Sequence, residues 1–358
     1  MICPHCEHNL LRKERPGNRC AYCKRLYALD PKTNTLGLSD LRVRRVMSEL
    51  SAGGHVAVSP GQLWYALSRR SLRTSRLGAA WNPLLAFGGA ALLLAGVLVP
   101  FVPAFLTGAV FLLVSLTVVV ARKAGVGRGV PPVDRDAFRS AVLVPWLRVY
   151  GELPPGLVDE PVRERDPYGA PPSPHGPAPD VRAAGVLLCP DPSVLAFLTA
   201  EGVAGHYGLV LVRTLDEAVG LAPRGPVIVL HDADAHGVLL VRRARDAFPS
   251  TRVVDAGLPV GKVHGLAQAV PVRDRRRGPD AAARRELAAL GEFGEAELKW
   301  LGRGWGFPLV GLPPARLLEV VARCAARTTR RPDPARAGAA GLGFLTWPSP
   351  GTGREPGQ

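Results

Sequence analysis

The chain has 358 residues, which is long enough for two or three units that each bury a core of their own. A formal net charge of +15 and a pI of about 10.2 favour acidic partners, either nucleic acid or anionic lipid. The abundance of arginine, glycine and proline is typical of a GC-rich bacterial genome, so part of this charge reflects composition rather than binding.

The first expected element is a metal site made of two C-x2-C pairs. Its residues are Cys3, Cys6, Cys20 and Cys23, and a secretory signal has no room ahead of them. Each pair can turn two thiolates toward one ion, so the two pairs close a tetrahedral zinc site without an open position. Residues 1–37 therefore resemble a zinc ribbon, with zinc in a structural role in a reducing compartment; His5 and His8 are not needed as ligands.

Basic and aromatic side chains surround this site. They are Arg12, Lys13, Arg15, Arg19, Lys24 and Arg25, with Tyr22 and Tyr27 available for stacking. Such a surface suits nucleic acid, a membrane surface or an acidic protein, and the pattern does not choose among them.

Residues 38–76 are expected to form a small basic helical segment. One helix follows Ser39, and a second starts at Pro60. The stretch QLWYAL is faintly similar to the tyrosine-bearing segment of winged-helix domains in type IIB topoisomerases, which would make Tyr65 a nucleophile. Packing of Trp64 and Tyr65 in a core is the favoured alternative.

Residues 77–121 contain no Asp, Glu, Lys, Arg or His and predict two transmembrane helices. We expect them over 81–99 and 104–121, with Pro100 and Pro103 at the turn and glycines between the helices. Basic residues flank both ends, which predicts a multi-pass protein of the cell membrane with both termini in the cytoplasm.

After the membrane segment, residues 122–180 read as an amphipathic helix followed by a Pro-rich linker. Residues 181–330 alternate short apolar runs with helical patterns, which predicts an α/β domain with a mostly parallel sheet. The Pro/Gly/Ala-rich tail, 331–358, is expected to be disordered.

The stretch VIVLHDADAHG, residues 227–237, ends a buried strand in two acids spaced one residue apart. A strand followed by D-x-D-x-x-G and a helix resembles the Toprim domain, and the HG is most similar to the version in type IIB topoisomerases. The resemblance implies that Asp232 and Asp234 bind Mg²⁺, as carboxylates on one face of an extended segment can. It also implies a glutamate at the end of the first strand.

This chain departs from that pattern, because Cys189 or Pro190 stands where the family has its glutamate. Asp191 is the nearest substitute, and Glu201 lies a helix away. The alternative is that Asp234 only caps the helix that begins near His236. No P-loop, dinucleotide motif or nucleophile with a credible base is evident, and neither is a small-molecule cofactor.

These features predict a membrane-anchored cytoplasmic zinc-ribbon protein. Its degenerate Toprim-like domain would bind nucleic acid or a protein partner without catalysis. A first alternative is a Mg²⁺-dependent nuclease or topoisomerase-related enzyme with Asp232, Asp234 and Asp191 as its acids. A second is a zinc-ribbon scaffold in the membrane.

Overall fold

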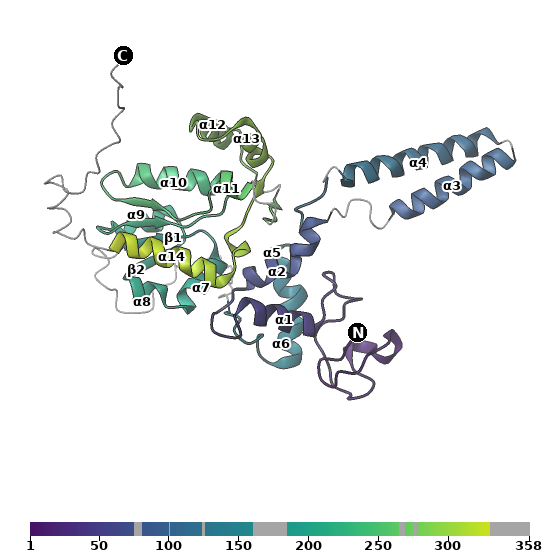
Figure 1. The fold of residues 1–358 in the computed structure, drawn as a ribbon, viewed down its shortest axis with the longest axis horizontal. Helices are drawn as coiled ribbons and strands as arrows, with labels where there is room; N and C mark the ends of the chain where they lie inside the picture. The colour runs from purple at the N-terminus through teal and green to yellow at the C-terminus, as the bar shows by residue number, and fades with distance from the viewer. Residues whose placement is uncertain are drawn as a thin grey trace, which may run out of the picture.

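The computed structural model describes residues 1–74, 81–99, 101–123, 126–159, 185–264, 269–274 and 278–329. They form a cysteine-rich ribbon, a helical body, a helical hairpin that projects from this body, and an α/β domain (Figure 1). Most of the predicted Pro-rich linker and the whole of the predicted disordered tail lie outside the described residues.

The helical body is built from segments on both sides of the hairpin. They are α1 (Asp40–Leu50), α2 (Pro60–Arg73), α5 (Arg135–Phe138), the π-helical turn η3 (Arg139–Leu143) and α6 (Val144–Tyr150). The indole nitrogen of Trp64 in α2 donates to the carbonyl oxygen of Val133, 2.9 Å away, just before α5. The hairpin is therefore an insertion within one packed helical unit.

Helix α2 also contacts the α/β domain, and the two parts share one continuous hydrophobic core. Tyr65 is 4% exposed, and its hydroxyl donates to the carbonyl oxygen of Val270 at 2.7 Å. Burial raises the pKa of Tyr65 to about 12. The side chain is thus a core residue, as the favoured alternative predicted, and it is not placed as a nucleophile.

The α/β domain begins with alternating strands and helices. They are β1 (Gly185–Leu188), α7 (Pro192–Ala200), α8 (Val203–Tyr207), β2 (Leu209–Val212), α9 (Leu215–Leu221), β3 (Val227–Val229), α10 (Ala235–Ala247) and β4 (Val253–Asp255). All four strands are parallel, in the order β2-β1-β3-β4. This agrees with the predicted parallel sheet, but it does not show the Toprim resemblance.

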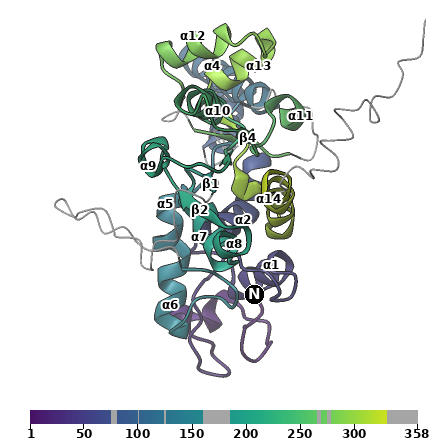
Figure 2. The same cartoon turned by 90° about the vertical axis from the view of Figure 1, so that its left-hand side faces the viewer.

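Alternate side chains of the central strands pack into two separate layers. Leu187 and Ile228 belong to the core that contains α7 and α14 (Pro314–Thr329). Val186 and Val229 belong to a second core, with α9 and α10. Helices therefore cover both faces of the sheet (Figures 1 and 2), which explains why its strands are apolar throughout.

The remaining elements close the domain. They are α11 (Val260–His264), β5 (Val272–Arg273), α12 (Ala281–Ala289), α13 (Glu295–Gly302), β6 (Trp305–Gly306) and the 3-10 turn η4 (Leu309–Gly311). Strands β5 and β6 pair antiparallel in a small second sheet. The Phe307 amide and carbonyl bond to Ala233, so the segment after β6 crosses the carboxyl end of β3.

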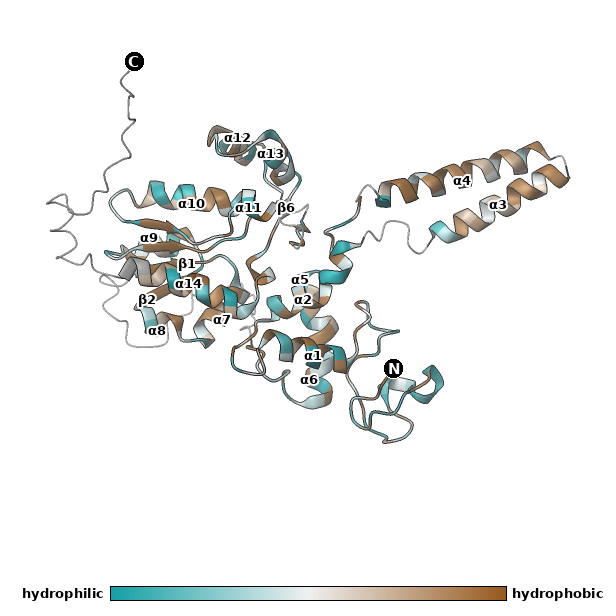
Figure 3. Cartoon of the chain, viewed as in Figure 1, coloured by the Kyte–Doolittle hydropathy of each residue, from teal (hydrophilic) through white to brown (hydrophobic). Residues whose placement is uncertain are grey.

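The hairpin consists of α3 (Asn82–Leu98) and α4 (Val102–Lys123), and it is mostly apolar, with hydrophilic residues at the ends that join the body (Figure 3). Among the described residues, only α4 is long and apolar enough to cross a membrane, with 22 residues and a mean hydropathy of 2.5 over its most apolar 18 residues. Helix α3 has 17 residues, at the lower limit of a span. The structure thus supports one of the two predicted spans by length and composition. Helix α4 begins two residues earlier than expected.

Candidate metal centre and aspartate cluster

The four N-terminal cysteines converge as the sequence predicts. Their sulfur atoms all lie within 4.8 Å of one another. Cys3 Sγ is 3.8 Å from Cys23 Sγ, and Cys6 Sγ is 3.7 Å from Cys20 Sγ. Zinc–sulfur bonds of about 2.3 Å in a tetrahedron place the sulfurs about 3.8 Å apart. The four thiolates therefore have the spacing that one zinc ion requires.

The two cysteine pairs adopt the same backbone turn. Cys3 and Cys20 each accept, through their carbonyl oxygens, the amide of the residue that follows the second cysteine of the pair. Those residues, Glu7 and Lys24, have φ of 58° and 60°, a left-handed conformation that costs a non-glycine residue roughly 1–2 kcal/mol. A metal bound by both turns offsets this strain.

The ribbon is fixed to the helical body by buried polar contacts. Within the ribbon, Arg15 Nη1 lies 2.7 Å from Asp30 Oδ1, and the pair is almost fully buried. Asp40, at the start of α1, accepts the amides of Ala28 and Leu29 and the hydroxyl of Tyr150. The ribbon is therefore docked onto the body.

This docking corrects two predictions about the surface of the ribbon. Arg15 is held by Asp30, and Tyr27 is completely buried, so neither is available to a ligand. The aromatic residue that remains on the surface is Tyr22, which stacks on the imidazole of His8 at 4.5 Å. The basic residues that remain exposed are Arg12, Lys13, Arg19, Lys24 and Arg25.

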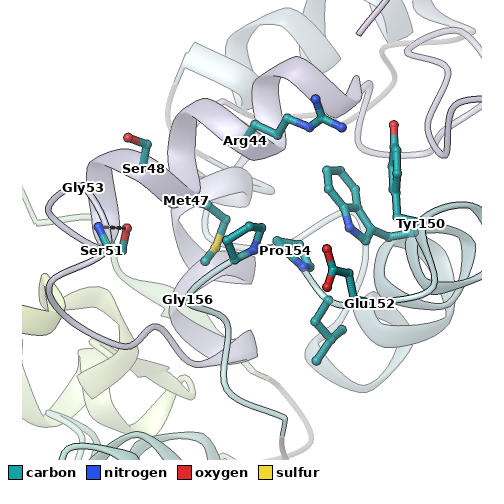
Figure 4. A pocket seen from close by; sticks show the side chains of 13 residues that line it. Arg44, Met47, Ser48, Ser51, Gly53, Tyr150, Glu152, Pro154 and Gly156 are labelled. Atoms are coloured by element: carbon teal, nitrogen blue, oxygen red, sulfur yellow. Dashed lines mark hydrogen bonds between the residues drawn. The ribbon is translucent and has the colours of Figure 1, made fainter. Parts of the chain in front are cut away.

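A hollow of about 640 Å³ lies beside the ribbon, between α1 and the segment that follows α6 (Figure 4). The guanidinium of Arg44 lies 5.8 Å from the ring of Trp146 and 5.2 Å from that of Tyr150. It also donates to the carbonyl oxygen of Pro4 at 3.5 Å, which places the hollow next to the metal centre. Sequence reasoning missed this feature, because its walls come from residues about a hundred positions apart.

Asp191 lies at the carboxyl end of β1 and is held by Arg135. Its two oxygens accept from Arg135 Nη1 and Nη2 at 2.7 and 2.6 Å. The same carboxylate caps α7 by accepting the amides of Ser193 and Val194. Arg135 belongs to α5, so the helical body supplies the positive charge at this end of the sheet.

Asp232 and Asp234, which follow β3, also have partners within the chain. Asp232 Oδ1 accepts the Leu309 amide at 2.7 Å, and Asp234 Oδ1 accepts the Gly237 amide at 2.7 Å as the cap of α10. Burial, together with the charges of Asp191 and Asp234, raises the pKa of Asp232 to about 7.

The structure does not support magnesium at these aspartates. Within the described part of the chain, the four cysteines are the only group of three or more ligands placed closely enough for one ion. Arg135 occupies both oxygens of Asp191, the predicted substitute for the missing glutamate. Asp234 caps the start of α10, which is the alternative to a metal site that the sequence allowed.

His231 is buried beside these aspartates, and both of its ring nitrogens have partners. Its Nε2 lies 3.1 Å from Asp255 Oδ1, and its Nδ1 lies 2.6 Å from the carbonyl oxygen of Asp232. Burial lowers the pKa of His231, but the hydrogen bond to Asp255 and the charge of Asp255 outweigh it, so the net shift is upward. His236 is exposed on α10.

The raised pKa of Asp232 makes the stability of the protein depend on pH. Folding favours the protonated carboxyl, so its contribution is present below the ordinary pKa of 3.8 and is lost as the pH rises through about 7. We expect Asp232→Asn to be more stable than wild type, with a gain that grows by about 2 kcal/mol from about pH 5.5 to about pH 8.5. Denaturant unfolding at both pH values measures it.

The control is Asp246→Asn, because Asp246 is exposed on α10 and its pair with Arg242 is exposed as well. A gain in Asp232→Asn that is the same at both pH values would show that Asp232 is ionised in the folded state throughout.

No family model matches this chain, and neither does any curated protein or solved structure. The Toprim resemblance therefore rests on the D-x-D motif and the order of elements alone.

Proposed function

We propose that this chain is a non-catalytic binding protein that a two-helix hairpin anchors in the cell membrane, with its zinc ribbon and α/β domain in the cytoplasm. Three features support this proposal. They are the basic flanks and close packing of the hairpin, the carboxyl end of the parallel sheet, where Arg135 and Leu309 bind the aspartates, and the exposed basic face of the ribbon. Each leads to a different part of the proposal.

The hairpin is proposed to cross the membrane twice. Basic residues lie at both ends that join the body: Arg69, Arg70 and Arg73 in α2, and Arg122, Lys123 and Arg128 around the end of α4. Such residues favour the cytoplasmic side. Seventeen residues of α3 extend about 25 Å, and Trp81 before it is suited to the interface.

Close packing of α3 on α4 favours two helices that insert together. A Cβ on Gly96 would lie 2.5 Å from the backbone nitrogen of Phe105, and one on Gly108 would lie 2.5 Å from that of Leu93. Only glycine allows this approach, and small residues are typical of helix contacts within membranes.

The non-catalytic assignment rests on Arg135. In parallel α/β sheets ligands bind at the carboxyl ends of the strands, where the strand order reverses. In this sheet that point lies between β1 and β3, and Arg135 and the Leu309 amide already bind Asp191 and Asp232 there. A guanidinium from the helical body thus stands where a nuclease would hold a cation.

The proposed partner of the ribbon is nucleic acid. Five exposed cationic side chains and the exposed Tyr22 lie within its first 25 residues. Cations that contact phosphates and an aromatic ring on which a base stacks are the elements of sequence-tolerant recognition. An acidic protein is the competing partner for the same face.

The test measures binding of fluorescently labelled single-stranded DNA to the full chain in lipid nanodiscs by anisotropy, over a range of salt. Lys24→Ala with Arg25→Ala should weaken binding and lower the slope of log affinity against log salt by about 1.4, because each lost phosphate contact contributes about 0.7. Arg242→Ala with Arg316→Ala, two exposed residues elsewhere, serves as control.

No binding at low salt, or equal losses in the two double variants, would remove nucleic acid as the partner of the ribbon. Resistance of the chain to alkaline extraction from membranes tests the anchor separately.

A further inference from the structure

The small sheet of β5 and β6 lies directly beside the exit of the hairpin. The Val126 amide bonds back to the carbonyl oxygen of Ala121 in the last turn of α4, at 2.9 Å. Three residues later Gly129 donates to Leu72 of α2 at 2.9 Å and accepts from Arg273 of β5 at 2.8 Å. Three residues span at most about 11 Å, so β5 is held close to the end of α4.

Trp305 of β6 is packed onto this connection. A Cβ on Gly129 would collide with the indole of Trp305, and Gly129 has a φ of 74°, so glycine is required there on both grounds. Figure 3 places β6 on the side of the body from which the hairpin projects. The connection therefore holds Trp305 near the last turn of α4.

The residues around Trp305 combine aromatic rings with positive charge. Trp300 of α13 stacks on Trp305 with ring centroids 6.5 Å apart and an interplanar angle of 11°. The guanidinium of Arg273 lies 5.7 Å from the centroid of Trp305. Lys299, in the last turn of α13, and Arg303, directly after this helix, are both exposed. Neither tryptophan is fully buried, so both rings reach the surface.

Acidic residues also lie near this surface. Glu297 caps the start of α13 by accepting the Gly294 amide, and its other oxygen is turned toward Gly261. Glu295 lies in the first turn of α13, four residues before Lys299 and on the same face of the helix. Asp274 is the one acid that directly neighbours Arg273 in sequence.

We propose that the surface of Trp300, Trp305, Arg273, Lys299 and Arg303 lies on the cytoplasmic leaflet next to the hairpin and binds anionic phospholipid headgroups. Indole rings favour the membrane interface, and basic side chains within a Debye length of the membrane are attracted to its anionic lipids. This surface continues the proposed membrane anchor and rests on it. It would fix the tilt of the body, and so the height of the zinc ribbon, above the membrane.

The test uses the full chain in nanodiscs whose lipids carry bromine near the headgroup end of the acyl chains, where bromine quenches nearby tryptophans. Wild type is compared with Trp300→Phe/Trp305→Phe, and the difference between their emissions reports these two rings. We expect at least half of that difference to be quenched. The matched control is Trp146→Phe, because Trp146 is buried in the helical body.

A second comparison tests the charge. Quenching in wild type should at least double from pure phosphatidylcholine to a mixture with phosphatidylglycerol, and high salt should reverse the increase. Lys299→Gln/Arg303→Gln should abolish this dependence, whereas Arg242→Gln/Arg316→Gln should retain it.

Failure of the chain to enter nanodiscs would overturn the anchor and this inference together. Entry into nanodiscs without quenching of the Trp300 and Trp305 component would overturn the lipid-binding surface alone. Quenching that is independent of phosphatidylglycerol would overturn the role of anionic headgroups.

Discussion

Replacing Cys20 with alanine is expected to release zinc from the chain and to unfold the ribbon. Among the described residues, the apolar cluster around the cysteines contains only Leu10 besides the cysteines themselves, so the metal supplies most of the folding free energy of this part of the ribbon. Structural zinc contributes about 10–16 kcal/mol in small domains of this kind. The effect should be strongest around the cysteines, because Ala28, Leu29 and Leu36 of the ribbon belong to the core that the helical body and the α/β domain share.

Zinc content by mass spectrometry and amide hydrogen exchange measure this prediction. One zinc per chain should fall to none, and the amide of Leu10, which bonds to Met1 at 2.7 Å, should lose its protection. Cys324→Ala is the matched control, since Cys324 lies on α14, far from the metal centre in sequence. Full zinc content in Cys20→Ala would mean that the four thiolates are not the ligands.

The second large effect is expected from Arg135→Gln. The Asp191 carboxylate would then be left buried without its cation, a loss that costs about 3–5 kcal/mol when a buried pair is broken. The Arg135 side chain is 27% exposed, so we expect the lower end of that range. Amides in α5 and α7 should exchange faster, because the pair joins the helical body to the α/β domain.

A double-mutant cycle with Asp191→Asn separates the ion pair from the cap of α7. Asparagine caps helices as well as aspartate does, so this variant keeps the hydrogen bonds to Ser193 and Val194. Arg139→Gln is the control, because its pair with Asp159 is exposed and contributes at most about 1 kcal/mol. Equal losses in Arg135→Gln and Arg139→Gln would show that the carboxyl end of the sheet is not closed by an ion pair.

The same variant bears on the pKa of Asp232. Arg135 is among the charges that lower this pKa, against the dominant effect of burial. Removing the cation should therefore move the pKa of Asp232 further upward and shift the pH dependence of stability toward alkaline pH.

The sequence by itself determined the features that depend on near neighbours. The two C-x2-C turns are local, and so is the cap that Asp234 places on α10 three residues later. The parallel sheet follows from short apolar strands that alternate with helices. The uncharged stretch predicted apolar helices, although only α4 meets the length of a span without reservation.

Only the tertiary structure determined which polar residues have hydrogen-bond or ion-pair partners within the chain. Arg135 meets Asp191 across 56 positions, Leu309 meets Asp232 across 77, and Tyr65 meets Val270 across 205. No local pattern encodes such pairs, because burial and charge balance depend on how distant elements pack. The packing of the helical body on the end of the sheet therefore turned three candidate metal ligands into an ion-paired acid, an acid with a raised pKa and a helix cap.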